Sequence, residues 1–139
     1  MNAKQIENLR VAYAIMAGIP AERIKLSIYR RNAQGYVRVS GWNDKDFIND
    51  CGSVGCMAGW LSAHPHFKCQ GLKWNAERIK DVNASMALFG VFDVFDSGPE
   101  GLLGKRVALS RIRRALHNVD AIDDRRYYEL EKEELQMTE

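Results

Sequence analysis

The sequence lacks the features that define several common protein classes. It has no run of about 18 apolar residues, so no membrane-spanning segment is predicted. Neither a G-x-G-x-x-G nor a Walker A pattern is present, so the sequence predicts neither of these two phosphate-binding loops. No internal repeat, low-complexity tract or pair of carboxylates suited to hydrolysis stands out. With 139 residues, the chain is most simply a single domain covering residues 1–139.

Cysteine is scarce, and the three residues present are an odd number. A secreted domain held by disulfides would need an even number of cysteines and a signal peptide. The polar start at Met1–Lys4 leads into an amphipathic stretch rather than an apolar signal core. We therefore expect a cytoplasmic protein with reduced thiols, in which a buried cysteine packs as a small apolar residue.

A large excess of one charge is also missing. Twenty Lys and Arg face 18 Asp and Glu, which gives a formal net charge of +2. The charge is unevenly distributed, because residues 129–139 contain five Glu and one Lys, leaving +6 on the remainder. The sequence predicts a mildly basic body with an acidic end. That excess is too small to indicate nucleic-acid binding by itself.

Hydrophobic periodicity predicts an α+β fold, a mostly helical single domain with one small β-hairpin packed against a central buried helix. Apolar residues spaced by three and four favour helices, and caps and stop signals set their limits. The expected helices are 4–17, 54–63 with Ser53 as its N-cap, 76–89 with Asn75 as its N-cap, 104–118, and an acidic helix from about 123 with a frayed end.

The hairpin is predicted from a change of period after Pro20. Residues 24–28 alternate between apolar and polar side chains, and residues 36–39 alternate again after a turn-like loop at 31–35. A helix over 21–31, started by Pro20, is the alternative interpretation.

The stretch from Cys51 to Trp60 is the most unusual part of the chain, with two cysteines and three glycines ahead of a tryptophan. On a helix, Gly55 and Gly59 would share one face and let another backbone approach closely. Glycine costs about 1 kcal/mol relative to alanine in a helix interior, so its repetition indicates a packing or functional reason. The leading interpretation makes Cys51 and Cys56 small core residues.

Two chemical interpretations of the same region stay open. Cys51 precedes the expected helix, whose N–H groups would favour a thiolate, and its Asp-Cys-Gly context is similar to the nucleophile segment of papain-like peptidases. A thiol enzyme would need one of the three histidines, His64, His66 or His117, as its base. Alternatively, zinc would be the cofactor, with spacings that a zinc site admits. Its candidate ligands are Cys51, Cys56, His66 and Cys69.

Basic residues concentrate in the predicted helix 104–118. One face is expected to carry Ala108, Ile112, Ala115 and Val119, and the opposite, solvated face Arg106, Ser110, Arg113, Arg114 and His117. Such a basic face can stay solvated, contact phosphates or bind an acidic protein surface. The candidate partner-binding residues are Arg106, Arg113, Arg114, His117 and, from a polar loop, Trp42.

The segment Cys51-Gly52-Ser53-Val54-Gly55-Cys56-Met57-Ala58-Gly59-Trp60 resembles the C-G-[ST]-x-x-C-x-x-G-[WH] core of a group of small phage and prophage proteins. The resemblance implies an accessory protein made in an infected or lysogenic bacterium, and it brings no functional residues with it. The leading hypothesis is therefore a non-enzymatic phage accessory protein that binds a host or phage protein, with inhibition as one outcome. The alternatives are a thiol- or zinc-dependent enzyme centred on Cys51 and nucleic-acid binding through helix 104–118.

Overall fold

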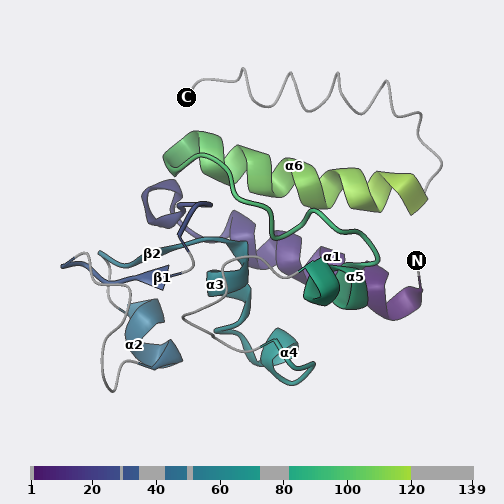
Figure 1. The fold of residues 1–139 in the computed structure, drawn as a ribbon, viewed down its shortest axis with the longest axis horizontal. Coiled ribbons are helices and arrows are strands. Elements are labelled where there is room, and N and C mark those ends of the chain that lie inside the picture. Colours follow the sequence, from purple (N-terminus) through teal and green to yellow (C-terminus); the bar gives the residue numbers. More distant parts are fainter. Residues whose placement is uncertain (1, 29, 35–42, 50–51, 73–81, 120–139) are drawn as a thin grey trace.

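The fold of the protein, taken from a computed structural model, is described for residues 2–28, 30–34, 43–49, 52–72 and 82–119 (Figure 1). It is mostly helical, with a two-stranded antiparallel sheet packed against the helices, as the sequence predicts. Within the described ranges, no helix combines the length and apolar character that a bilayer crossing requires. The elements are α1 (Ala3–Ala17), the 3-10 helix η1 (Ala21–Arg23), β1 (Arg30–Arg31), α2 (Asp44–Asn49), β2 (Val54–Gly55), α3 (Met57–Leu61), α4 (Pro65–Lys68), α5 (Val82–Phe89) and α6 (Gly101–Val119).

Helix α1 forms where the sequence predicts it. Asn2 caps its start by accepting a hydrogen bond from the Gln5 backbone, while the Gln5 side chain accepts one from the Asn2 backbone. Gly18 ends the helix, as expected. The buried face consists of Asn8, Leu9, Ala12 and Met16.

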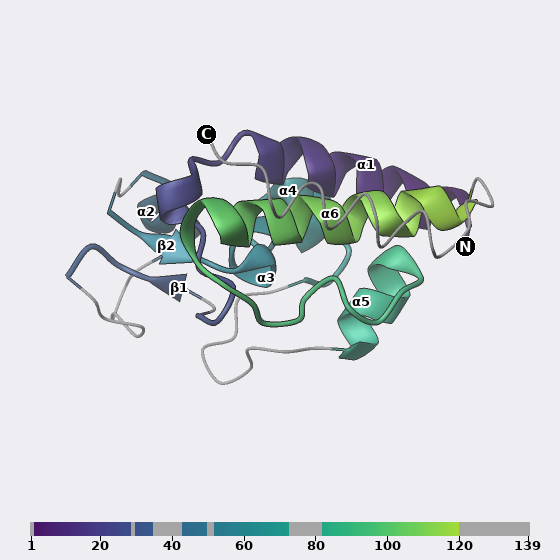
Figure 2. The same ribbon diagram turned by 90° about the horizontal axis from the view of Figure 1, so that it is seen from above.

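Helix α6 lies antiparallel beside α1, so that it starts near the end of α1 and finishes at the end of the molecule where α1 begins (Figures 1 and 2). Lys105 joins the two helices by donating hydrogen bonds to the carbonyl oxygens of Ala17, at 2.9 Å, and Ile19, at 2.7 Å. Of the predicted inner face, Ala108, Ile112 and Ala115 are buried, as expected. The helix begins at Gly101, three residues before the predicted start.

The two strands of the sheet are far apart in the sequence. β1 pairs with β2, so that Arg30 lies opposite Gly55 and Arg31 opposite Val54. The expected partner strand at 36–39 lies outside the described residues. Arg31 was expected in the turn and instead lies in β1.

The segment 24–28 is not a strand, although the sequence predicts one, and the alternative helix over 21–31 is reduced to η1. Ile24 and Leu26 are both buried, which explains the alternating pattern. Isolated backbone hydrogen bonds hold this segment: the Lys25 N–H donates to the Gly55 carbonyl, and the Leu26 N–H donates to the Pro99 carbonyl.

The central helix is shorter than predicted. Val54 and Gly55 belong to β2, and α3 begins after Cys56, its N-cap residue. Ser53 does not cap it, because the Ser53 hydroxyl donates to the Phe47 carbonyl at 2.6 Å and accepts from Arg23 at 2.6 Å. The expected shared helical face of Gly55 and Gly59 is therefore absent. The prediction that this helix is central and buried is confirmed, since every residue of α3 is buried.

The remaining helices complete the core. The central helix was expected to run to about Ala63 and stop before Pro65, but α3 ends at Leu61, and Pro65 instead starts α4 inside a region expected to be a loop. Helix α5 stops at Phe89, as predicted, before Gly90, whose φ of +74° suits glycine. Its predicted beginning, including Asn75, and the acidic helix expected from about 123 lie outside the described residues. Phe89 contacts Phe67 and Phe95, which ties α5 to α4 and to the chain before α6.

Candidate functional site

Helix α6 is the most strongly charged element of the described chain. Its 19 residues contain five basic side chains and no Asp or Glu. A helix with charge of only one sign creates a local positive potential that attracts acidic groups. The five cations are Lys105, Arg106, Arg111, Arg113 and Arg114.

Three of these cations also hold the fold together. Lys105 binds carbonyl oxygens at the end of α1, as described above. Arg111 donates to the Asp96 carbonyl at 2.5 Å and to the Ser97 carbonyl at 2.9 Å, which fixes the turn ahead of α6. Arg113 donates to the Tyr13 hydroxyl at 3.0 Å and lies 5.9 Å from the centre of that ring. The basic character of α6 is therefore partly structural.

The structure brings four of the five predicted partner-binding residues onto one helix. Arg106, Arg113, Arg114 and His117 all lie on α6 and are half-buried rather than fully solvated. Trp42 lies outside the described residues. The prediction that Ser110 belongs to a solvated face is wrong, because Ser110 is only 4% exposed.

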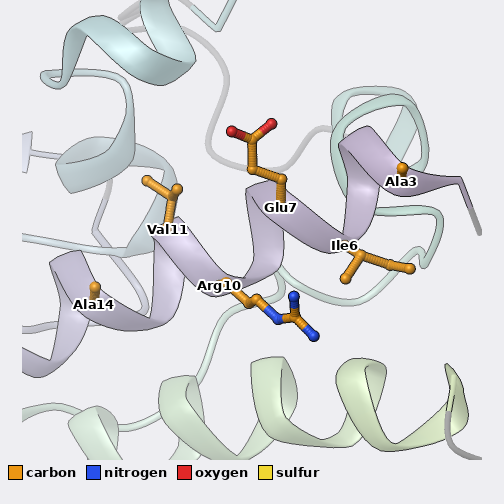
Figure 3. Close-up of a pocket in the computed structure, with 6 residues that line it drawn as sticks. All are labelled: Ala3, Ile6, Glu7, Arg10, Val11 and Ala14. Atoms are coloured by element: carbon orange, nitrogen blue, oxygen red, sulfur yellow. The ribbon is translucent and has the colours of Figure 1, made fainter.

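The exposed side of α1 lines a groove of about 530 Å³ (Figure 3). Arg10 points to the side of α1 on which α6 lies, whereas Glu7 points to the other side. Sequence periodicity placed Ile6 on the inner face of the helix 4–17 and predicted no groove on the outer face. The lining residues recur every three or four positions, which was the available signal. They are Ala3, Ile6, Glu7, Arg10, Val11 and Ala14.

The described cysteines occupy contrasting environments. Cys56 is 2% exposed, and burial raises the pKa of its thiol, so the neutral form dominates near pH 7. Because the thiolate is the reactive and metal-binding form, Cys56 is a poor nucleophile and a poor ligand in this state. Cys69 is exposed at the end of α4. Cys51, the candidate nucleophile, lies outside the described residues.

The candidate histidines are placed around α4 and α6. His66 Nε2 lies 2.8 Å from the side-chain oxygen of Asn8, so this nitrogen is engaged in a hydrogen bond to a buried residue. Burial lowers the pKa of His64, which keeps that ring neutral. His117 is on α6. In the described ranges, no three His, Cys, Asp or Glu side chains are grouped to hold a metal, so Cys56, His66 and Cys69 do not form such a set.

A buried arginine is the main polar feature that the sequence did not reveal. Arg30 is 2% exposed and donates to the Gly59 carbonyl at 3.0 Å, Asp44 Oδ1 at 2.7 Å and Ser62 Oγ at 2.8 Å. Its guanidinium lies 4.6 Å from the centre of the Phe47 ring. These contacts anchor β1 to α2 and α3, which makes Arg30 a structural residue.

Asp44 links this buried arginine to the surface. Its second carboxylate oxygen accepts a hydrogen bond from Lys68 at 2.7 Å. Burial acts to raise the pKa of Asp44, but the hydrogen bonds from Lys68 and Arg30 outweigh it and hold the pKa below its ordinary value. Asp44 is therefore an ionised structural partner and not a proton donor near neutral pH.

A second polar network joins α1, α4 and α5. Asn8 is 1% exposed, and its amide donates to the Leu88 carbonyl at 2.9 Å. The amides of Asn8 and Gln70 exchange two hydrogen bonds, at 2.9 and 3.0 Å. Such closed networks satisfy buried polar groups and specify a unique packing.

In comparisons with family models, curated proteins and solved structures, none matches the chain. The assignment of a function therefore depends on the geometry of the residues themselves. Among the described residues, the basic helix α6 and the groove lined by α1 are the prominent surface features.

Proposed function

We propose that the protein acts by binding an acidic surface of another protein through the basic side of α6. The composition of α6 supports this most directly, with five Lys and Arg and no Asp or Glu. Complementary charge speeds association and selects partners, even where each exposed pair adds little affinity. The resemblance of residues 51–60 to the phage group favours a host or phage protein in the bacterial cytoplasm as the partner.

The contact residues proposed are Arg106, Arg113, Arg114 and His117, with Trp42 as a further candidate. Tyr13 holds the Arg113 side chain in place by a hydrogen bond and a ring contact. A side chain that is already ordered loses less conformational freedom on binding. Arg113 is therefore suited to pair with a carboxylate at low entropic cost.

Protein binding is favoured over nucleic-acid binding because much of the basic content has an internal role. Lys105 and Arg111 bind backbone carbonyls, and Arg113 binds Tyr13. A phosphate-binding surface gains affinity from each cation that it can offer to the backbone of the nucleic acid. Because backbone carbonyls engage Lys105 and Arg111, α6 offers fewer cations to an extended polyphosphate than its composition suggests, which favours a compact acidic protein patch.

Binding is also favoured over thiol chemistry at the described cysteines. Cys56 is buried with a raised pKa, and His66 is hydrogen-bonded to Asn8. A thiol enzyme or zinc site centred on Cys51 remains the alternative. Metal analysis of the purified chain, together with titration of the Cys51 thiol across pH, tests it directly.

Affinity capture from a bacterial lysate tests the proposed function. The full chain is compared with an Arg106→Glu, Arg114→Glu variant, and with Lys45→Glu, a single reversal at an exposed site on α2. We expect the α6 variant to lose a bound acidic protein that both the unchanged chain and the Lys45 variant retain. Equal recovery by all three chains contradicts the proposal. Capture that disappears after nuclease treatment assigns α6 to nucleic acid instead.

A further inference from the structure

The groove on α1 lies on the side of the helix that faces away from the core. Ala12, which is fully buried, follows Ala3 by nine positions, about two and a half turns, so the two residues point in opposite directions. Ala14 lies about three turns after Ala3 and therefore points the same way as Ala3. Glu7 and Arg10 lie between the two alanines, and all four of these lining residues are exposed. This side of α1 is therefore accessible to another molecule.

Four of the lining residues have the spacing that two paired helices use. They follow one another at intervals of four, three and four positions, which places side chains along the seam of a helix pair. These residues are Ala3, Glu7, Arg10 and Ala14. The distance between paired helices depends on the side chains at the contact, and alanine permits a close approach. The face therefore fits a helix that offers small residues to the two alanines and opposite charges to Glu7 and Arg10.

The six lining residues match one another in pairs. Each pair is centred between positions 8 and 9, and its members are two alanines, two aliphatic residues or two opposite charges. The pairs are Ala3 with Ala14, Ile6 with Val11, and Glu7 with Arg10. When two copies of α1 are related by a two-fold axis through that centre and run antiparallel, each residue is level with the other member of its pair in the second copy. The lining of the groove is therefore complementary to itself.

We infer that α1 docks antiparallel against α1 of a second copy of this chain, with ion pairs between Glu7 of each copy and Arg10 of the other. The charges determine this orientation. In the antiparallel arrangement both charged contacts join opposite signs, whereas a parallel arrangement would set Glu7 level with Glu7 and Arg10 level with Arg10. Each copy supplies half of both ion pairs, so the interface is complete only when the two copies meet.

Within one copy, the two charged side chains of the groove are not directed at each other. Arg10 points to the side of α1 on which α6 lies, and Glu7 points to the other side (Figure 3). Glu7 pairs with Lys4 at 3.1 Å, where both side chains are 56% exposed. An exposed ion pair of this kind contributes little to stability, so Glu7 can turn to an arginine of the second copy with little loss.

The size of this face sets the strength expected of the dimer. Helix α1 has 15 residues and is therefore about 22 Å long. A single pair of helices of this length is at the small end of specific interfaces, so we expect an association that depends on the protein concentration. The contact uses no cation of α6. The inference therefore goes beyond the proposed function and does not depend on it.

Analytical ultracentrifugation of the full chain over a series of protein concentrations tests the pairing. We expect the average mass to rise from that of the monomer toward that of the dimer. Glu7→Arg and Arg10→Glu each set like charges across both contacts, and each should raise the dissociation constant at least about tenfold. The double variant exchanges the two charges and should restore the dimer, and an equal mixture of the two single variants should form it as well. Lys45→Glu, an exposed reversal on α2, is the control and should dimerise like the unchanged chain.

Three results overturn the inference. The first is a chain that stays monomeric at every concentration, and loss of a captured protein from such a monomer on Glu7→Arg substitution would assign the face to a different partner. The second is a dimer that both single reversals leave unchanged, because it uses another surface. The third is a dimer that the single reversals weaken and the double variant does not restore, because its helices are not paired antiparallel. The lysate capture is a separate measurement: capture that ignores the α6 charge reversal would refute the proposed partner surface and leave the α1 pairing intact.

Discussion

Arg113 of α6 donates a hydrogen bond of 3.0 Å to the hydroxyl group of Tyr13 in α1, and its guanidinium lies 5.9 Å from the centre of the same ring. The two residues are 100 positions apart in the sequence. Their contact joins the two longest helices at mid-length, while Lys105 joins them at one end. The helix proposed to bind a partner is therefore fixed to α1 by side-chain contacts.

Replacing Tyr13 by Phe should remove the hydrogen bond and keep the ring. We expect the free energy of unfolding to fall by about 0.5–1.5 kcal/mol, the usual contribution of one intramolecular hydrogen bond. Urea denaturation monitored by circular dichroism measures the change. Arg10→Lys, at an exposed position on α1, is the control and should change the stability by less than about 0.5 kcal/mol. A Tyr13→Phe variant as stable as this control would show that the bond contributes nothing.

Asp44 should make the stability dependent on pH in the acid range. Its pKa in the folded protein lies below the ordinary value of 3.8, so its contribution is fully present above that value. The contribution is lost as the pH falls from about 4 toward the lowered pKa, because folding must then compete with protonation. We expect Asp44→Asn to flatten this part of the stability profile, measured by urea denaturation between about pH 2.5 and 6.

The same substitution should also cost stability near neutral pH. Asp44→Asn removes the charge of an acceptor 2.7 Å from the buried Arg30, and we expect a loss of about 1–3 kcal/mol. Lys68→Ala removes the other, exposed partner of Asp44 and should cost less than about 1 kcal/mol. If Asp44→Asn and Lys68→Ala lower the free energy of unfolding equally, the ion pair between Asp44 and the buried Arg30 contributes no more than the exposed pair between Asp44 and Lys68.

Cys56 should be chemically silent in the folded protein. Burial raises the pKa of its thiol, so the thiolate that would attack a reagent is scarce as well as inaccessible. In a Cys51→Ser, Cys69→Ser variant, Cys56 is the remaining thiol. We expect a disulfide reagent to label it only after urea is added. Labelling of the native variant at the rate of a small free thiol would show that Cys56 is reachable.

The long helices could be predicted from the sequence because their signals are local. In α1, the apolar stripe and Gly18 lie within one element, and the same holds for Ala108, Ile112 and Ala115 in α6. The sheet could not be predicted in this way. Each strand has two residues, and their pairing depends on bringing Arg30 to Gly55 through tertiary contacts.

The misplaced start of the central helix has a specific cause. Ser53 is a common N-cap residue, but its hydroxyl is engaged by Phe47 and Arg23, which are distant partners that no local rule reveals. In the candidate site, the sequence indicated Arg106 and Arg114 through helical periodicity. It could not indicate that Ser110, which lies between them on the helical wheel, is buried, because burial depends on how the helix packs and not on its own periodicity.

Gly104 should be the glycine of α6 that least tolerates a side chain. A Cβ atom added there would overlap the carbonyl oxygen of Pro99, and a backbone atom cannot rotate away as a side chain can. Gly104→Ala should therefore force α6 away from the turn before it and cost about 1–3 kcal/mol, as overpacking usually does. Gly18→Ala is the matched control, because its Cβ would be 3.6 Å from the nearest atoms, an ordinary contact, and its φ is −82°. We expect the control to be neutral or slightly stabilising, since alanine restricts the unfolded chain more than glycine does. Thermal unfolding of the two variants compares them, and a Gly104→Ala protein that melts with the Gly18→Ala protein would show that α6 does not approach Pro99 this closely.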